Sequence, residues 1–212
     1  MKRRALLALG LLPSLPALGQ TRPQAAPALR PATLSAQDRA DITRIEAYLN
    51  ALRTMRSRFL QVAPDGQVTE GNAWIQRPGR MRFEYDPPSP LLLVAGSGQG
   101  LFFDKALNQV SYFPLSSTPL GILLSDNMRL SGEVTVSAVE RLPGQIHVVL
   151  YRTASPGDGT LTLVFADGPL SLRQWMITDP QQRETTVSLF NVSLGATFDP
   201  KLFDITDPRP RE

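Results

Sequence analysis

Residues 74–85 read Trp-Ile-Gln-Arg-Pro-Gly-Arg-Met-Arg-Phe-Glu-Tyr, two alternating patterns that meet at Pro78-Gly79. Such a pattern predicts a β-hairpin with a tight turn. Because successive side chains of a strand point to opposite faces, Met81, Phe83 and Tyr85 share one face, and the charged residues between them share the other. The stretch therefore predicts a sheet with one apolar face and one charged face.

Arg77 is the residue that fits this hairpin least. It falls on the same face as Ala73 and Ile75, immediately before the proline. One interpretation is an arginine at a strand end whose guanidinium reaches water. The other is an arginine directed at an element that closes over the sheet. The hairpin alone leaves both open.

From Arg56 onward the sequence consists largely of short alternating or apolar runs separated by Pro, Gly and Asp, as in an antiparallel meander. The predicted strands are 56–62, 68–76, 80–86, 91–95, 101–104, 109–113, 133–142, 145–152, 160–165, 171–178 and 184–194. A sheet of roughly ten strands does not stay flat. We therefore expect a mainly β fold in which the sheet curls into a barrel or part of one.

Three segments predict helices. Ser35 and Asp38 form a capping-box signal before apolar residues spaced three and four apart, which predicts a helix of roughly four turns. The run 118–124 predicts a short helix with Pro119 at its first position, and 199–203 predicts a single helical turn. Short helices need a surface to lie on, so we expect all three to form a lid on the inner side of the sheet. Its apolar residues would be Ile42, Ile45, Leu49, Leu52, Leu120, Leu123 and Leu124.

The N-terminus is typical of an exported protein. Residues 2–4 are basic and precede a short apolar run, which predicts a signal peptide over residues 1–19. An uncleaved membrane anchor is the alternative, although two prolines and the short length argue against a spanning helix. Residues 20–34 are rich in Pro and Ala and predict a flexible tether, and residues 35–208 predict a single domain. Without cysteine the chain has neither a disulfide framework nor a lipid-modified N-terminus, and we expect a periplasmic location.

Charge and composition exclude several function classes. The net charge is +3, and the first 19 residues hold three basic side chains; removing those leaves 19 Lys and Arg against 19 Asp and Glu. Nucleic-acid binding is therefore disfavoured. The one histidine, His147, alternates with Ile146 and Val148 and falls on the opposite face. We predict no metal, no cofactor and no catalysis; a hydrolase would have to depend on His147.

The sequence resembles the outer-membrane lipoprotein carrier (LolA) family over residues 36–208. The resemblance is carried by Phe59-Leu60-Gln61, by Gly71 before Trp74, by the run 77–85, by Thr118-Pro119-Leu120 and by the closing turn 199–203. It implies an unclosed antiparallel β-barrel, or half-barrel, capped by helices, with an apolar interior that takes acyl chains. It also implies the partners of a monomeric carrier: acylated lipoprotein cargo, an ABC-type releasing complex in the inner membrane, and a receptor or the membrane surface on the outer side.

Two residue roles follow from the resemblance. Arg77 resembles the arginine that latches the lid in the empty, closed form. Met81 stands where the best-known members have a phenylalanine that engages the releasing complex, and the chain also ends soon after Pro208, where many members continue. The residues expected to line the ligand cavity are Ile75, Met81, Phe83, Tyr85, Leu91, Leu93 and Phe102, with ordinary core as the alternative for each, and with Trp74 and Trp175 as packing residues.

Elementary energetics explain why such a carrier is needed. Burying one methylene contributes about 0.8 kcal/mol, so a sixteen-carbon chain gains roughly 12 kcal/mol on leaving water. A cavity that matched this value would not release its ligand, and a lid that must be displaced offsets part of it. The alternative on the same fold is an envelope protein that shuttles another lipid or senses mislocalised lipoproteins.

Overall fold

The computed structural model describes residues 29–209. The predicted signal peptide and most of the predicted tether lie outside this range. The last residues of the tether contact the domain: the Ala32 N–H donates to the Val136 carbonyl at 2.9 Å, and Ala32 and Leu34 pack against the core. Ala32 and Leu34 therefore belong to the folded domain.

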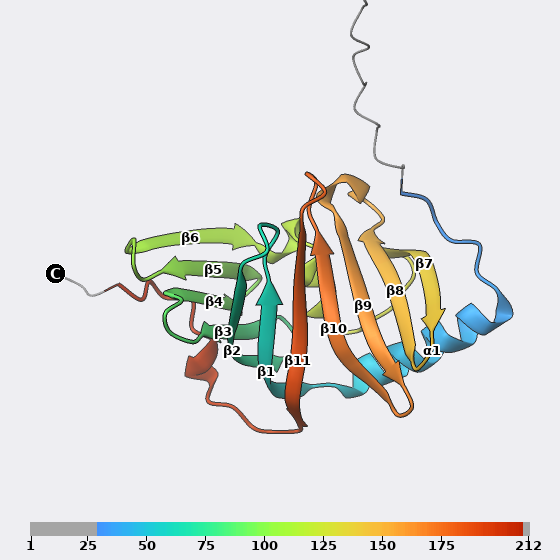
Figure 1. The fold of residues 1–212 in the computed structure, drawn as a ribbon, viewed down its shortest axis with the longest axis horizontal. Coiled ribbons are helices and arrows are strands. Elements are labelled where there is room, and N and C mark those ends of the chain that lie inside the picture. Colours follow the sequence, from blue (N-terminus) through green and yellow to red (C-terminus); the bar gives the residue numbers. More distant parts are fainter. Residues whose placement is uncertain (1–28, 210–212) are drawn as a thin grey trace, which may run out of the picture.

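The described residues form one antiparallel sheet of eleven strands, in the order β6-β5-β4-β3-β2-β1-β11-β10-β9-β8-β7 (Figure 1). The strands are β1 (Thr54–Val62), β2 (Val68–Gln76), β3 (Arg80–Tyr85), β4 (Leu91–Gly96), β5 (Gln99–Asp104), β6 (Gln109–Pro114), β7 (Val134–Leu142), β8 (Gln145–Arg152), β9 (Thr160–Asp167), β10 (Leu170–Thr178) and β11 (Glu184–Leu194). The two edge strands β6 and β7 do not pair with each other, so the sheet is an open half-barrel. The predicted fold class is confirmed.

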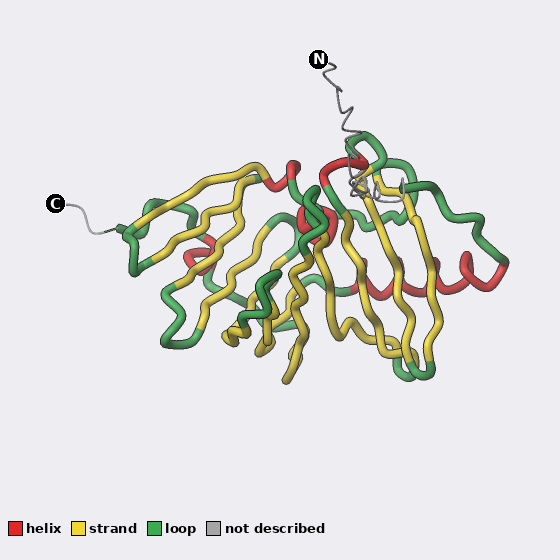
Figure 2. The backbone as a smooth tube through the Cα atoms, turned by 45° about the horizontal axis from the view of Figure 1, so that its top comes forward, coloured by secondary structure: helices red, strands yellow, loops and turns green. Residues whose placement is uncertain are grey.

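The sheet consists of two meanders that meet in its middle. Strands β1–β6 each pair with the next in sequence, as do β7–β11. The join is the pairing of the first strand with the last, from Met55 opposite Leu194 to Val62 opposite Thr186. Figure 2 shows the two wings of the sheet with a short helix, seen end-on, between them.

Helix α1 begins where the sequence predicts, and α2 begins one residue later than predicted. Helix α1 (Ala36–Ala51) has the expected capping box, with the Asp38 N–H 3.1 Å from Ser35 Oγ and the Ser35 N–H 2.7 Å from Asp38 Oδ2. Between the two meanders lie the 3₁₀ turn η1 (Leu115–Ser117) and helix α2 (Leu120–Leu123). Pro119 precedes α2 as its N-cap instead of serving as its first residue. Two further 3₁₀ turns are η2 (Pro156–Asp158) and η3 (Pro200–Phe203).

The inner face of the sheet carries the core. Alternation places Met55 and Phe59 of β1, Ile75 of β2, and Met81 and Phe83 of β3 on this face, all at most 2% exposed. Helix α1 covers the inner face with its buried stripe and crosses the wing of β8–β10 (Figure 1). The core therefore lies between the sheet and the helices, as expected of a lid.

One expectation about the lid is wrong. The turn η3 lies on the outer face of the sheet, where Arg82 Nη1 donates to the Leu202 carbonyl at 3.1 Å. A second apolar cluster there, formed by Leu92, Val94, Leu101 and Phe103 with Ile205 packed against it, needs this cover. Strand β4 is apolar on both sides, so its outer side recruits the C-terminal segment. In the structure the lid consists of α1 and residues 115–130, and the name is used in this sense below.

Gly71 is the glycine on which the centre of the sheet depends. A Cβ atom at this position would lie 2.0 Å from the Glu84 carbonyl oxygen and 2.7 Å from Phe59 Cε1. Gly71 pairs with Phe59 on one side and Tyr85 on the other. Its missing side chain allows the two aromatic rings to meet over it, with centroids 5.1 Å apart.

Candidate functional site

An apolar cavity of about 160 Å³ lies between α2 and the inner face of the sheet. Side chains from β3, β4, β10, β11 and α2 form most of its wall. The lining residues are Gln61, Met81, Phe83, Leu93, Leu120, Trp175, Ile177, Thr185 and Val187. Seven of these nine residues are apolar, so the cavity suits an apolar ligand. The chain has one histidine and no cysteine.

Aromatic rings build one wall of the cavity. Phe83 packs against Phe59 with centroids 4.7 Å apart and meets the edge of Trp175 at 6.0 Å. Trp175 is only 1% exposed. Edge-to-face contacts of this kind fix the orientation of the rings, so this wall is preformed.

The structure places the residues expected in the cavity at different distances from it. Met81, Phe83 and Leu93 line it, together with Leu120 of the lid. Ile75 is fully buried beside Met81, its partner across the β2–β3 ladder. Tyr85 and Leu91 lie on the same face further along their strands, and Phe102 is half-buried opposite Leu93, outside the cavity lining. The other lid residues, Ile42, Ile45, Leu49, Leu52, Leu123 and Leu124, are part of the buried core.

Sequence reasoning missed the contribution of the second meander. Trp175 and Ile177 of β10 stand opposite Val187 and Thr185 of β11, and all four line the cavity. Trp175 is a packing residue, as expected, and also a wall of the cavity. Alternation within β10 and β11 shows which residues share a face. That this face adjoins Met81 follows only from the pairing of β1 with β11.

A polar pair stands at one end of the cavity. The Tyr85 hydroxyl donates to Gln61 Oε1 at 2.8 Å. Burial raises the pKa of Tyr85 to about 12, and the hydrogen bond to Gln61 offsets part of that rise. The phenol is therefore neutral at physiological pH and remains a hydrogen-bond donor.

Arg77 joins the sheet to the lid. Its side chain is 5% exposed, so the interpretation of an arginine that reaches water is excluded. Nη1 donates to the carbonyl of Leu49 near the end of α1, and Nε and Nη2 donate to the carbonyl of Ser125 at 2.9 and 2.5 Å. Burial lowers the pKa of Arg77, with a smaller effect from Arg53, while Asp126 acts in the opposite direction. One guanidinium thus holds both parts of the lid.

The two parts of the lid are also bonded to each other. Asn50 of α1 exchanges two hydrogen bonds with the backbone of Met128, at 2.8 and 3.0 Å. Glu46 accepts from the Leu130 N–H at 2.6 Å. The Gly79 N–H, in the turn after Arg77, donates to the Leu124 carbonyl at 2.9 Å. The contacts of Asn50 and Glu46 couple α1 to residues 128–130, and the Gly79 contact joins the β2–β3 turn to residue 124.

The other end of α1 is held by charge. Asp41 is 1% exposed and accepts from Arg141 of β7 at 2.6 and 2.8 Å and from Arg44 at 3.0 Å. Arg44 also bonds Asp167 at 2.7 Å. These ion pairs hold the first half of α1 to β7 and β9, whereas Arg77 holds its last turn to the β2–β3 hairpin.

His147 and the acidic side chains within residues 29–209 are arranged as follows. In this range no three His, Cys, Asp or Glu side chains come together to hold a metal ion. The His147 ring lies on the outer face, with Nε2 3.0 Å from Gln145 Oε1. None of the described helices is long and apolar enough to cross a membrane.

Comparison with known proteins identifies the family of this chain. Residues 50–206 match the model of the family described as outer membrane lipoprotein carrier protein LolA. The chain belongs to the LolA family. The outer-membrane lipoprotein carrier protein of Methylococcus capsulatus is 29% identical over 175 residues, covering 78% of this chain and 83% of the relative. That of Pseudomonas aeruginosa is 29% identical over 182 residues, covering 82% and 86%.

A solved structure is similar as well. It is a putative outer membrane lipoprotein-sorting protein domain from Vibrio parahaemolyticus, with 9% identity and a TM-score of 0.48, covering 77% of this chain and 95% of that chain. The LolA family match includes all eleven strands and both α2 and η3, but it begins at Asn50 and so leaves out most of α1. One partner of Arg77, Leu49, lies just before the first matched residue, so this contact joins the matched and unmatched parts of the chain.

Proposed function

We propose that the chain is a periplasmic carrier that takes acylated lipoproteins from a releasing complex in the inner membrane to the outer membrane. It binds the acyl chains on the inner face of the half-barrel, beneath the lid. Family membership supports a lipoprotein carrier. The observation that carries the mechanism is the buried Arg77 guanidinium, which bonds a carbonyl of each part of the lid above an apolar cavity.

The size of the cavity supports an opening lid. Cavities that enclose ligands are typically about 300–1,000 Å³. The cavity of about 160 Å³ is smaller, so a long acyl chain requires displacement of Leu120 and its neighbours. The lid residues are apolar on the side that faces the sheet, and a displaced lid would add its own surface to the wall.

Met81 is proposed as the contact with the releasing complex when the lid is open, since it is only 1% exposed in the closed form. It lies in the cavity wall on β3, near the turn that bonds the lid through Gly79. Methionine is flexible and apolar, and so can replace an aromatic side chain in such a contact. The protein acts as a binding protein in this proposal, and His147 has no part in it.

A release assay tests the proposal. Spheroplasts of the source organism would be incubated with the mature protein, and the supernatant probed for acylated lipoproteins. We expect release by the wild type, loss with Met81→Glu, and retention with Met81→Phe as the matched control. Circular dichroism would verify that both variants fold. If the wild type released no lipoprotein and carried phospholipid instead, the lipoprotein role would be refuted in favour of a lipid shuttle on the same scaffold.

A further inference from the structure

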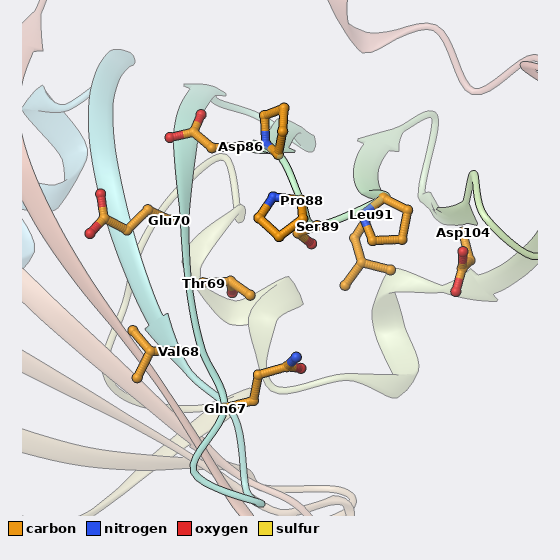
Figure 3. A pocket seen from close by; sticks show the side chains of 11 residues that line it. Gln67, Val68, Thr69, Glu70, Asp86, Pro88, Ser89, Leu91 and Asp104 are labelled. Carbon is orange, nitrogen blue, oxygen red and sulfur yellow. The ribbon is translucent and has the colours of Figure 1, made fainter.

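A second, larger hollow opens beside the cavity. It has a volume of about 580 Å³ and lies between the first residues of β2 and the loop 86–90 that leads into β4. Figure 3 shows Gln67 to Glu70 along one side, Asp86, Pro88, Ser89 and Leu91 across from them, and Asp104 beyond. We call this hollow the cleft. Nothing in the carrier mechanism described above uses it.

The sequence explains why the sheet is open at this point. Regular pairing of β2 with β3 ends at Gly71 opposite Tyr85, and one more bond follows, from the Asp86 N–H to the Glu70 carbonyl at 2.9 Å. Residues 87, 88 and 90 are prolines, which lack the N–H that would continue the ladder. The Ser89 N–H is used by the Asp86 carbonyl within the loop.

The interrupted ladder leaves a short edge on β2. The Ala63 N–H donates to the Gln67 carbonyl, so Val62 and Val68 form a non-hydrogen-bonded pair between β1 and β2. In antiparallel geometry the N–H and C=O of Val68 then point away from β1 and toward the cleft. An edge of this kind accepts an extended peptide by backbone pairing.

The cleft is also acidic. Glu70, Asp86 and Asp104 contribute three carboxylates. Arg58 bonds Glu70 at 3.2 Å and Asp86 at 2.6 Å. The positive charge of its guanidinium balances one of the three carboxylate charges. The remaining negative charge favours a ligand with cationic side chains.

The cleft and the apolar cavity share a border. Thr69 of the cleft is the β1–β2 partner of Gln61, which lines the cavity. Leu91 of the cleft and Leu93 of the cavity lie on the same face of β4. Gln61 also accepts a hydrogen bond from the Tyr85 hydroxyl. A molecule with an apolar end and a peptide end can therefore occupy both.

We propose that the cleft binds the polypeptide of the cargo immediately after its acylated end, as an extended cationic segment paired to the Val68 edge. This inference rests on the proposed function and adds a second contact to it. The acyl chains occupy the cavity, and the peptide leaves past Tyr85 and Gln61. Cargo selection would then depend on the first residues of the polypeptide as well as on its lipid.

Binding measurements with two synthetic probes test the inference. One probe is a dipalmitoylglyceryl-cysteine without a peptide, and the other carries a short lysine-containing tail. Val68→Pro removes the N–H that points into the cleft and leaves the β1–β2 bonds intact, whereas Val68→Ala keeps it. We expect Val68→Pro to weaken binding of the tailed probe about three- to tenfold, the effect of one hydrogen bond. The tail-free probe should bind both variants and the wild type equally.

The outcomes separate the two proposals. Equal binding of the tailed probe to wild type, Val68→Pro and Val68→Ala would overturn the cleft inference and leave the carrier intact. Failure of the wild type to bind even the tail-free probe would overturn the carrier function and the inference with it. Because the chain has no cysteine, a single photo-crosslinker at Ser89→Cys gives an independent readout. It should label the tail of a bound probe, and the same reagent at the exposed Leu142→Cys should not.

Discussion

Replacing Arg77 by methionine should convert the protein into a carrier that binds its ligand more tightly. Methionine keeps the unbranched apolar stem and removes every donor that Arg77 directs to Leu49 and Ser125. The lid then loses the contact that joins both of its parts to the sheet. The remaining contacts of α1, including the ion pairs of Asp41, stay in place.

The size of the effect follows from the hydrogen bonds. A hydrogen bond from a charged donor contributes about 1.5–3 kcal/mol. Arg77 donates to the carbonyl oxygens of Leu49 and Ser125, and more distantly to that of Asp126 at 3.4 Å. The cost of burying the guanidinium offsets part of this hydrogen-bond energy, and the lowered pKa of Arg77 has the same cause. The Arg77 contacts therefore stabilise the closed lid by about 3 kcal/mol in total. Each 1.4 kcal/mol is a factor of ten, so lid opening becomes easier by about a hundredfold.

The assay is a titration with an acylated probe. If only the open form binds, the apparent dissociation constant is inversely proportional to the population of that form. We expect binding to Arg77→Met to be up to about a hundredfold tighter, through faster association. Arg77→Lys keeps the charge but loses the forked donor geometry, and should lie between the two. An unchanged dissociation constant in a folded Arg77→Met protein would refute the latch.

Three further predictions concern stability. Asp41→Asn should lower the urea midpoint of unfolding several times more than Asp167→Asn, because the Asp41 carboxylate is buried and its partners bond it from two elements. A hydrogen bond from the capping serine is the main reason that the pKa of Asp38 falls from 3.8 to about 2. The Asp38 carboxylate therefore contributes fully to the free energy of unfolding above about pH 4, and this contribution is lost as the pH falls toward 2. Asp38→Asn should flatten that part of the acid-unfolding curve. Gly71→Ala should cost at least about 3 kcal/mol in urea unfolding because the backbone must move, whereas Gly157→Ala, with open space around it, should change little.

Much of the sheet could be predicted because alternation is a local property. The inner face of β3 follows from Met81, Phe83 and Tyr85, and the capping box locates the start of α1. The partners of Arg77 could not be found in this way, since backbone carbonyls such as those of Leu49 and Ser125 have no signature in the sequence. Only the fold decides which carbonyls come within reach of the guanidinium.

The misplacement of η3 and the missed role of Trp175 both concern how distant parts of the chain meet. The outer position of η3 was indicated by β4, whose Leu92 and Val94 need cover on the side away from the core, but a single helical turn suits either face. The role of Trp175 as a cavity wall depends on the pairing of β1 with β11. Such long-range pairings are set by the whole sheet and leave no local pattern.

That same pairing bears on how the chain folds. Each meander can form from neighbouring strands, whereas the pairing of β1 with β11 joins residues separated by more than half of the chain. Until β11 arrives, β1 has one bonded side and one open edge, and the core beneath α1 is incomplete. Contact order of this kind makes folding slow. If the chain is exported, the half-barrel therefore takes shape only after nearly all of its strands have crossed the membrane.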